Sequence, residues 1–474
     1  MATIKFGTDG WRGIIAQDFT FDNVRACAQA VADYVKGRGM ASRGLVVGYD
    51  TRFASEDFGA AVAEVLAASG VKAYLCSKPT PTPVISYSIV ARGAAGAAII
   101  TASHNPALYN GFKYKPEYAG SATPEVTAEL ERRIAEAQAK GHLEQMPLDE
   151  ALAKGLIEYI DASTPYLEHI ARLIDLGPIR EAGLKVVVDS MHGAGAGYLK
   201  SLLDGGRTAV TEINAERNPL FPGMERPEPI APNLSRLSSM VKESGASVGL
   251  ATDGDADRIG IVDERGTFVT QLQVFALLAL YLLEARGERG LLVKSRTTTS
   301  MIFRLGELFK VPVVETPVGF KYIAPIMIRE NALIGGEESG GFGFRGHIPE
   351  RDGILSALYL LDLMVRLRKS PAQLIDYLYS KVGPHHYDRI DLPLPQEEHP
   401  AIMARVSAAH PATLDGTRVA HIDGEDGFRF RLQDGAWLLV RFSGTEPVVR
   451  IYAEAASAER VKRLLAEGRK MAGI

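Results

Sequence analysis

Three aspartates, Asp253, Asp255 and Asp257, occupy alternate positions directly after the apolar run ASVGLAT. Carboxylates at this spacing can converge on one divalent cation, and an all-oxygen ligand set favours Mg²⁺, Mn²⁺ or Ca²⁺ over Zn²⁺. An EF-hand calcium loop is an alternative, since Glu264 stands at its twelfth position, but Arg258 replaces the glycine needed at the sixth. The following segment, IGIVDERGTFV, is typical of a β-hairpin. The pattern therefore favours a catalytic magnesium site over a calcium loop or a solvated acidic turn.

Arginines accompany two candidate loops. Arg258 follows the aspartates, where it offers either a bidentate contact to an anionic or hydroxylated substrate or a counter-ion for the carboxylates. A second loop, between the predicted strands AWLLVRF and VVRIYAEA, contains Arg441, Ser443, Gly444, Thr445 and Arg450. Arginines, hydroxyls and the amides around a glycine make a phosphate cradle. A hairpin turn alone would not require arginines at both ends, so this loop predicts phosphate binding.

Ser103 ends the apolar run in AIITASHNP and is followed by His104. A serine hydrolase needs a base and a partner acid, often with a Gly-x-Ser-x-Gly elbow, and this stretch lacks the elbow. Adjacency in sequence does not by itself place His104 to deprotonate Ser103. Alone, the stretch predicts a strand-end turn. Together with a magnesium site and a phosphate-binding loop, the stretch favours a serine hydroxyl that carries a phosphoryl group and transfers it to a sugar.

A glycine-rich loop, GGEESGG, supplies Glu337 and Ser339. Carboxylates accept hydrogen bonds from vicinal hydroxyls of the kind that a sugar presents, and glycines admit a ring close to the backbone. The neighbouring segment GHIPERDG adds His347 and Arg351. Glycine-rich acidic turns are common, so this loop indicates sugar binding only in combination with the other three.

The elements that must position these loops alternate in the manner of α/β domains. Helices are predicted over 55–70 and 123–141, where caps and terminal glycines frame a periodic apolar face. The predicted strands LVVGYD, KVVVDS and LLVKS are each followed, further along, by an apolar run that ends at Ser103, Asp253 or Glu337. This repeat predicts three related α/β units whose loops share a site beyond the strand carboxyl ends.

After about Ser370 the chain changes character. The segment DRIDLPLPQEEHP indicates a linker or an extended edge, and later strands are joined by Asp-Gly turns before a C-terminal helix, SAERVKRLLAEGRKMAG. The last part is therefore predicted to be an α+β domain. A chain of 474 residues suits three or four domains in all.

The composition excludes several classes of protein. A net charge of −4 gives no overall basic field to attract nucleic acid or an anionic membrane. The two cysteines, Cys27 and Cys76, lie in apolar surroundings, which suits a reducing compartment. The start lacks a signal-peptide pattern, and the longest apolar run, Val274 to Leu283, is shorter than the roughly 20 residues of a membrane span. We therefore expect a soluble, cytoplasmic protein with no nucleic-acid or membrane partner.

Four motifs in this order, TASHNP, DGDADR, GEESGG and RFSGTEP, together with KFGTDGWRG near the start, resemble those of the α-D-phosphohexomutase superfamily, in particular phosphoglucomutases and phosphomannomutases. The likeness extends over essentially the whole chain. It implies an α/β fold with three related α/β domains, with mixed sheets, around a central cleft and a C-terminal α+β domain. The implied domains are 1–148 with the phosphoserine loop, 149–259 with the metal-binding loop, 260–372 with the sugar-recognition loop and 385–474 with the phosphate-binding loop.

The resemblance also implies roles for single residues. Ser103 would carry the phosphoryl group, and Asp253, Asp255 and Asp257 would hold Mg²⁺ together with a phosphate oxygen on that serine. Lys113 would serve as general acid or base. The other implied catalytic residues are His104, Arg258 and, as a second proton-transfer candidate, His347. The implied substrate-binding residues are Arg12, Gly319, Glu337, Ser339, Arg351, Arg441, Ser443, Gly444, Thr445 and Arg450.

The implied reaction interconverts hexose 1-phosphate and hexose 6-phosphate through a hexose 1,6-bisphosphate, and these sugar phosphates are the expected partners of a monomer or small homo-oligomer. GEESGG is nearer to the glucose and mannose forms, whereas Glu-Gln-Ser would indicate glucosamine. The glycines after Ser339 and the residue Val318 depart from well-known members, so phosphoglucosamine and phosphopentose mutases stay open. A sugar-phosphate phosphohydrolase and a non-catalytic sensor are further alternatives.

Overall fold

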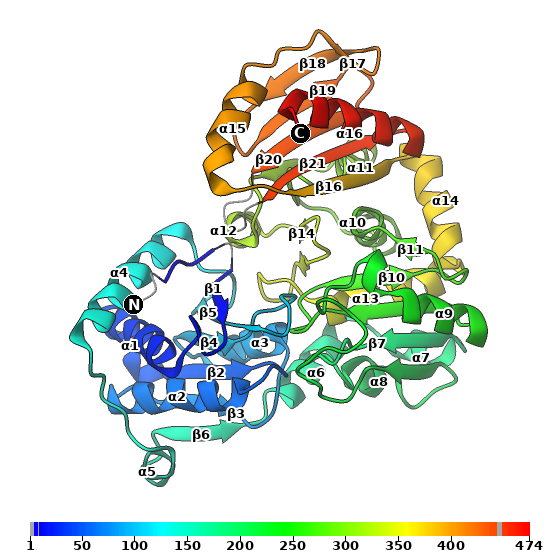
Figure 1. Cartoon of the computed structure of the whole chain (residues 1–474). Coiled ribbons are helices and arrows are strands. Elements are labelled where there is room, and N and C mark those ends of the chain that lie inside the picture. The colour runs from blue at the N-terminus through cyan, green and yellow to red at the C-terminus, as the bar shows by residue number, and fades with distance from the viewer. Residues whose placement is uncertain (1–3, 8, 443–447) are drawn as a thin grey trace.

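Four β-sheets organise the chain, whose computed structural model describes residues 4–7, 9–442 and 448–474 (Figure 1). Three sheets mix parallel and antiparallel strands, and the fourth, near the C-terminus, is antiparallel where it is described. The protein is therefore of the predicted α/β class, with three mixed sheets and a C-terminal α+β part.

The first two sheets and their helices follow one another along the chain. The first group contains β1 (Trp11–Ile14), α1 (Phe21–Gly37), η1 (Ala41–Arg43), β2 (Leu45–Tyr49), α2 (Ser55–Ala68), β3 (Ala73–Cys76), α3 (Thr82–Arg92), β4 (Gly96–Ile100), β5 (Tyr109–Pro116), α4 (Pro124–Lys140), α5 (Leu148–Ala153) and β6 (Ile157–Ile160). The second contains α6 (Ser163–Leu173), α7 (Gly177–Glu181), β7 (Lys185–Asp189), α8 (Tyr198–Leu203), β8 (Ala209–Ile213), η2 (Ala231–Asn233), α9 (Ser235–Ser244), β9 (Val248–Thr252), β10 (Ile259–Val262) and β11 (Phe268–Val269).

The other two sheets complete the chain. The third group contains α10 (Gln271–Leu280), the π-helical turn η3 (Tyr281–Ala285), β12 (Leu292–Ser295), α11 (Met301–Phe309), β13 (Val313–Thr316), α12 (Phe320–Glu330), β14 (Ile334–Gly336), β15 (Phe342–Phe344), α13 (Gly353–Leu367) and α14 (Pro371–Val382). The C-terminal group contains β16 (His386–Pro393), η4 (Gln396–Glu398), α15 (His399–Ser407), β17 (Thr413–Leu414), β18 (Thr417–Asp423), β19 (Phe428–Leu432), β20 (Trp437–Phe442), β21 (Val448–Ala455) and α16 (Ala458–Ala472).

The first three sheets share one strand plan, which confirms the predicted repeat. Each contains three parallel strands followed by an antiparallel one, in the orders β3-β2-β4-β5, β8-β7-β9-β10 and β13-β12-β14-β15. The connection before the antiparallel strand carries Ser103 in the first sheet, Asp253 to Arg258 in the second and Glu337 to Ser339 in the third. The three loops therefore hold equivalent positions in their sheets.

Strands outside the expected domain ranges extend the first two sheets. Strand β6 pairs with β3, so the first sheet includes residues 157–160, and β10 and β11 extend the second sheet to Val269. Strand pairing defines sheets and does not define independent domains, so the expected domain boundaries after residues 148 and 259 stay predictions.

Local signals set most helix ends as expected. Helix α4 has Thr123 as its N-cap, Pro124 in its first turn and Gly141 as its C-cap. Helix α2 differs, because Ser55 is its first residue and Ala54, at φ 55°, precedes it as the cap. The hydroxyl of Ser55 instead donates to Asp50 Oδ1 at 3.0 Å. The apolar run Val274 to Leu283 forms the buried helix α10 and the turn η3.

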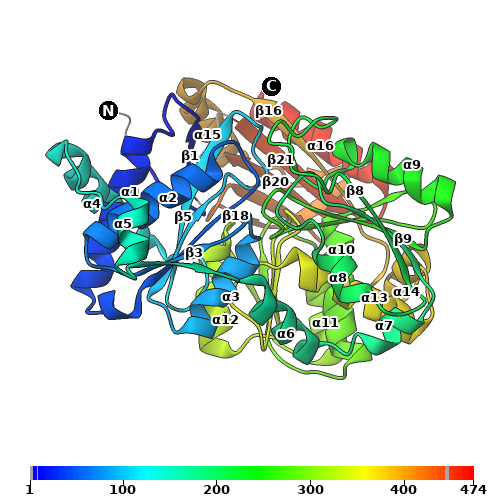
Figure 2. The ribbon, with the colours of Figure 1, turned by 90° about the horizontal axis from the view of Figure 1, so that it is seen from below.

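Two kinds of core hold these parts together. One continuous apolar core joins all three mixed sheets and includes Val46, Val186 and Leu292. The C-terminal sheet has its own core, formed with α15 and α16, in which Leu438 and Leu464 are fully buried. Figure 1 shows this sheet at the top, reached through α14, and the view from below in Figure 2 shows α4 and α9 at opposite ends of the molecule. No helix in the described residues is long and apolar enough to cross a membrane.

Candidate active site

Ser103 follows β4 in a left-handed backbone conformation, with φ at 52°. This conformation costs a residue with a side chain about 1 kcal/mol or more, so surrounding contacts must hold it. The side chain is buried, and its Oγ donates a 2.9 Å hydrogen bond to Asp253 Oδ2. The Nδ1 atom of His104 lies 3.4 Å from the same Oγ. The turn therefore directs the hydroxyl toward the aspartate loop of the second sheet.

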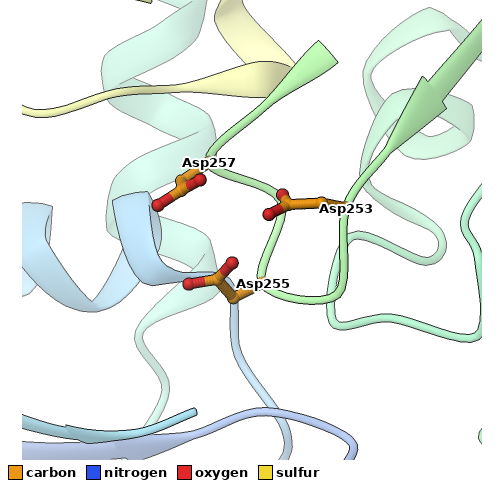
Figure 3. A group of neighbouring side chains, drawn as sticks. All are labelled: Asp253, Asp255 and Asp257. Atoms are coloured by element: carbon orange, nitrogen blue, oxygen red, sulfur yellow. The ribbon is translucent and has the colours of Figure 1, made fainter. Parts of the chain in front are cut away.

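The three aspartates of that loop point their carboxylates toward one another (Figure 3). One oxygen of each lies within 4.8 Å of the others, and all three residues are buried. The first sheet contributes Thr82, whose Oγ1 donates to Asp255 Oδ2 at 2.6 Å. A Cβ at Gly254 would lie 2.5 Å from the Ser103 carbonyl oxygen, so the two loops touch at a position where only glycine fits. The serine loop and the aspartate loop thus form one continuous structure.

The aspartate loop fits a hard divalent cation. Among the described residues, nothing donates a hydrogen bond to the buried Oδ1 atoms of Asp255 and Asp257. Buried carboxylate oxygens without a donor are costly, and a cation would satisfy them. Because all three side chains offer oxygen only, the set suits Mg²⁺ or Mn²⁺ rather than Zn²⁺.

Lys113 of β5 supplies positive charge against this loop. Its Nζ lies 2.8 Å from Asp9 Oδ2, 2.8 Å from Asp255 Oδ2 and 3.4 Å from Asp257 Oδ2. Burial disfavours the ammonium, but the carboxylates outweigh it and raise the pKa of Lys113. Burial also opposes ionisation of Asp255, yet Lys113 lowers the pKa of that carboxyl. The cation nearest to Asp253 is more distant, with Arg258 Nε 3.9 Å from its Oδ2, so burial, together with repulsion from the two neighbouring aspartates, raises the pKa of Asp253 well above the ordinary value.

A cavity of about 540 Å³ is lined by side chains from all four sheet groups. The predicted residues on its wall are Arg12, His104, Arg258, Glu337, Ser339, Arg351, Arg441 and Arg450. This volume falls in the range of about 300–1,000 Å³ that is usual for sites of small molecules. With five arginines among these eight residues, the cavity suits an anionic ligand that also presents hydroxyl groups.

Arg351 joins the third sheet group to the aspartate loop. Its guanidinium donates to Asp9 at 2.5 Å, lies 2.8 Å from Asp257 Oδ2 and approaches Glu337 Oε2 at 3.4 Å. Burial disfavours its charge, but these carboxylates raise the pKa of Arg351 well above the ordinary value. A Cβ at Gly341 would overlap the Arg351 side chain. Glycine at this position therefore leaves the space that the arginine side chain occupies.

Gly319 is a further predicted residue beside the cavity, and Arg12 on the wall also contacts the loop of Ser103. Gly319 caps α12 with φ at 129°, a glycine conformation, between the lining residues Val318 and Phe320. Arg12 donates to Asn105 Oδ1 at 2.5 Å, which links β1 to the serine loop.

The C-terminal loop contributes its flanking arginines. The Nε of Arg441 donates to Asp426 Oδ1 at 2.9 Å, and Asp426 Oδ2 accepts the Val318 N–H at 2.9 Å. The Nε of Arg450 lies 3.5 Å from Asp391 Oδ2. The predicted phosphate-binding residues Ser443, Gly444 and Thr445 lie outside the described residues.

The two predicted histidines have different surroundings. His104 lies on the cavity wall, where burial and the charges of Arg258 and Arg12 hold its pKa well below the ordinary value. The side chain of His347 is fully buried elsewhere, with Nε2 2.9 Å from Asp352 Oδ2 and Nδ1 3.1 Å from His169 Nε2. The structure therefore brings His104 to the cavity and does not bring His347 there.

Sequence reasoning assigned no role to several residues that complete the site. Asp9 contacts Lys113, Lys115 and Arg351, and its signal was its place in the quoted motif KFGTDGWRG. Arg389 donates to Glu338 Oε1 at 2.8 Å and lines the cavity, although its segment was predicted only as a linker or edge. Such contacts join residues far apart in the chain, so spacing alone does not reveal them.

Three repeated α/β units and a C-terminal sheet that share one polar cavity define a multidomain α/β class. Models of four domains match the chain in order: phosphoglucomutase/phosphomannomutase alpha/beta/alpha domain I at residues 3–141, domain II at 164–266, domain III at 271–382 and the C-terminal domain at 391–471. The chain belongs to the phosphoglucomutase/phosphomannomutase family, whose members are phosphohexomutase isomerases.

Individual relatives agree with this assignment. The chain is 33% identical to the phosphoglucomutase/phosphomannomutase of Thermococcus kodakarensis over 467 residues, 98% of each chain. It is 32% identical to the probable phosphoglucosamine mutase of Methanothermobacter thermautotrophicus over 459 residues, 96% of this chain and 95% of that one. The fold also matches the crystal structure of a "putative phosphomannomutase" of Thermus thermophilus over 100% of both chains, with a TM-score of 0.86 and 36% sequence identity.

Proposed function

We propose that the protein interconverts hexose 1-phosphate and hexose 6-phosphate, of glucose, mannose or both, through phosphorylated Ser103 and a hexose 1,6-bisphosphate. The observation that carries this proposal is the hydrogen bond from Ser103 Oγ to Asp253, 2.9 Å long, between a buried serine and a buried aspartate triad. A serine that faces a cation site beside an arginine-lined cavity suits phosphoryl transfer better than hydrolysis of an ester.

The protein's own groups divide the work of the transfer. The bond between phosphorus and Ser103 Oγ breaks while a bond forms from phosphorus to a free sugar hydroxyl, whose proton passes to a nearby base. Mg²⁺, held by Asp253, Asp255 and Asp257, would supply positive charge to the transferring group. Arg258 and Arg12, on the cavity wall, add positive charge there. Lys113, within 2.8 Å of Asp255, is the proposed proton-transfer residue beside this loop, and because its pKa is raised it is proposed to act as the acid, which donates a proton to the Ser103 oxygen as the phosphoryl group leaves.

The opposite end of the substrate is assigned to the third and C-terminal groups. Glu337 and Ser339 lie on the cavity wall and offer acceptors to sugar hydroxyls. Arg441 and Arg450, with Ser443, Gly444 and Thr445, are proposed to hold the phosphate that is not being transferred. The same cradle must accept either end of the sugar, because the bisphosphate has to turn over between the two transfers.

A phosphoglucosamine mutase is the second candidate. Several relatives over nearly the whole chain carry the name probable phosphoglucosamine mutase, at 31% or 32% identity. The sequence Glu337-Glu338-Ser339 favours glucose and mannose over glucosamine as substrate. A coupled assay with the 1-phosphates of glucose, mannose and glucosamine, with catalytic bisphosphate added, separates the two candidates.

The proposal is tested by the Ser103→Ala variant. We expect it to lose nearly all mutase turnover while it still binds the sugar phosphate, because only the group that accepts phosphate is removed. Ser88→Ala is the matched control, since Ser88 is also buried in the first group and its hydroxyl donates to the Val84 carbonyl within α3. Full turnover in Ser103→Ala would contradict the proposal, and stoichiometric release of inorganic phosphate by the wild type would indicate a phosphohydrolase instead.

A further inference from the structure

We propose that Arg52 is the positioning residue of the serine loop, and that with Asp50 it fixes the backbone on both sides of Ser103 for phosphoryl transfer. This inference rests on the proposed function of Ser103. Asp50 and Arg52 directly follow β2, in the sequence GYDTR, and the proposed mechanism gives neither side chain a role. Both side chains are buried, and neither lines the cavity.

The guanidinium of Arg52 binds four carbonyl oxygens of the serine loop. Its Nη2 donates to Ser103 O at 2.7 Å and to Asn105 O at 2.6 Å. Its Nη1 donates to Pro106 O and to Tyr109 O, each at 2.9 Å. The four terminal N–H bonds of the planar fork are therefore all directed at one loop, which a lysine ammonium could not reproduce.

Asp50 reaches the other side of the serine through Thr101. The Thr101 hydroxyl donates to Asp50 Oδ2 at 2.5 Å and accepts the Ser103 N–H at 2.8 Å. Asp50 Oδ1 accepts the Arg52 N–H at 2.9 Å, so the two charged residues are tied to each other. Both peptide groups of Ser103, its N–H and its carbonyl, are thus held by the same short segment.

These hydrogen bonds hold Ser103 in a strained backbone conformation. Ser103 has φ at 52°, a conformation that relaxes unless neighbouring contacts oppose it. Its carbonyl oxygen also faces Gly254 of the aspartate loop, where no side chain fits. A rotation of the serine peptide would therefore move Oγ away from Asp253 and disturb the contact between the two loops at the same time.

The segment is anchored to the second sheet group as well. The ring of Phe221 lies 5.0 Å from the Arg52 guanidinium, and Arg217 donates to the carbonyls of Thr51 and Arg52 at 3.0 and 3.1 Å. The Thr51 hydroxyl donates to His192 O at 2.8 Å. Arg52 therefore sets the serine loop relative to the group that carries the aspartates, and not only within its own sheet.

The test compares Arg52→Lys with Arg43→Lys. Arg43 is an exposed arginine of the first group that also binds loop carbonyls, those of Gly93 and Ala94, away from Ser103. Each protein is treated with hexose 1,6-bisphosphate and Mg²⁺, and phosphorylation of Ser103 is followed by mass spectrometry well below the unfolding temperature. Mutase kcat and KM are measured in parallel.

We expect Arg52→Lys to phosphorylate Ser103 about 100-fold more slowly and to lose a similar factor in kcat, because a displacement near 1 Å costs about this much. KM should change far less, since Arg52 does not line the cavity, and Arg43→Lys should match the wild type. Thr101→Val, which removes the acceptor for the Ser103 N–H, should slow phosphorylation at least about tenfold and decides the question if Arg52→Lys does not fold.

Wild-type phosphorylation rates in both Arg52→Lys and Thr101→Val would overturn the inference. So would a loss that Arg43→Lys shows equally, because that result would indicate a general role in stability. If the wild-type protein itself takes up no phosphoryl group at Ser103, the proposed function fails rather than the role of Arg52.

Discussion

The contact between the first and second sheets and the contact between the third and C-terminal sheets are built from different interactions. In the first, backbone groups touch: Gly254 lies against the Ser103 carbonyl, and the Thr82 N–H donates to the Asp255 carbonyl at 2.9 Å. The hydroxyls of Thr51 and Thr82 and the ammonium of Lys113 add side-chain contacts across the same boundary. In addition, one apolar core runs through all three mixed sheets.

The contact with the C-terminal sheet consists mainly of charged side chains. Glu315 lies 2.8 Å from Lys294 Nζ of its own sheet, and across the boundary it accepts from Arg429 at 2.9 Å and from Arg431 at 3.1 Å. Burial opposes its ionisation, but these cations lower the pKa of Glu315 to about 2. A second cavity, of about 550 Å³, lies among these residues, and the apolar core of the C-terminal sheet is separate.

This difference suggests how the site divides its tasks. Ser103 and the aspartates need a fixed geometry, and close-packed backbone provides it. The proposed phosphate cradle must meet both ends of a sugar, and a sheet that has its own apolar core can move as a body relative to the other three. We therefore expect changes at the first contact to lower kcat and changes at the second contact to raise KM.

Removal of divalent cations should have the largest effect, because it leaves the three buried aspartates without their central charge. We expect a chelator to abolish nearly all turnover and added Mg²⁺ or Mn²⁺ to restore it, with Zn²⁺ much less effective. A coupled mutase assay on the wild-type protein measures this. Full turnover in protein shown to be free of metal would contradict the role assigned to the aspartate loop.

Gly254→Ala should have the next largest effect, since its Cβ would lie 2.5 Å from the Ser103 carbonyl oxygen. The serine and aspartate loops must then separate, and we expect kcat to fall by about 100-fold or more. Gly37→Ala is a fair control, because a Cβ there would have 3.5 Å to its nearest neighbour, the end of Arg133. Equal kcat in the two variants would show that the contact between the loops is not needed.

Glu315→Gln tests the second contact. The substitution removes the charge of Glu315 from the buried cations Lys294 and Arg429, of which Arg429 keeps Asp423 at 3.2 Å, and this loss weakens the docking of the C-terminal sheet. We expect KM for the sugar phosphate to rise about tenfold, a change of about 1.4 kcal/mol, with kcat nearly unchanged.

The control for this change is Glu136→Gln, whose exposed pair with Arg132 on α4 should matter little. Steady-state kinetics at low and moderate salt give the measurement. A fall in kcat without a change in KM would remove the distinction drawn between the two contacts.

His169→Gln should have the smallest effect, which is a change in the pH dependence of stability. His169 lies where the first three sheet groups pack together. His169 stacks on Tyr87 and faces His347, with Asp352 and Arg172 nearby, and burial followed by His347 lowers its pKa to about 4. In the unfolded chain this histidine is protonated below about pH 6.5, whereas in the folded protein it stays neutral down to about pH 4. The free energy of unfolding therefore decreases as the pH drops from about 6.5 toward about 4.

This loss should be smaller in His169→Gln, by about 1 °C in Tm between pH 7 and pH 5, because His169 is partly exposed. His410→Gln, at an exposed position, should keep the wild-type dependence. An unchanged dependence in His169→Gln would show that this histidine does not take part in the linkage.

The sequence predicted the parts of the site that follow strands. Ser103, Asp253 and Glu337 were found because an apolar run ends at each of them, and the shared strand plan explains why these loops meet. The order of strands within a sheet depends on crossovers, which the local pattern does not encode. The placement of β6 in the first sheet shows this, since it pairs with β3 from far along the chain.

The sequence did not reveal the buried residues that hold the site loops in place. Arg52 follows a strand like many polar residues, and nothing in its spacing shows that its guanidinium binds four carbonyls of another loop. His347 shows the opposite case, since it stands beside a site motif in sequence yet lies buried against Asp352. Tertiary packing decides both outcomes.

In the proposed reaction one buried serine, Ser103, carries the phosphoryl group between substrate and product. The most direct test is to mix the protein with Mg²⁺ and a limiting amount of isotopically labelled hexose 1,6-bisphosphate, quench in acid and locate the labelled phosphate by peptide mass spectrometry. We predict the label at Ser103, at most one phosphate per chain, and we expect excess unlabelled hexose 1-phosphate, added before the quench, to move the label to the hexose phosphates while Ser103 is rephosphorylated. Steady mutase turnover with phosphate at another residue, or with none on the protein, would contradict the claim.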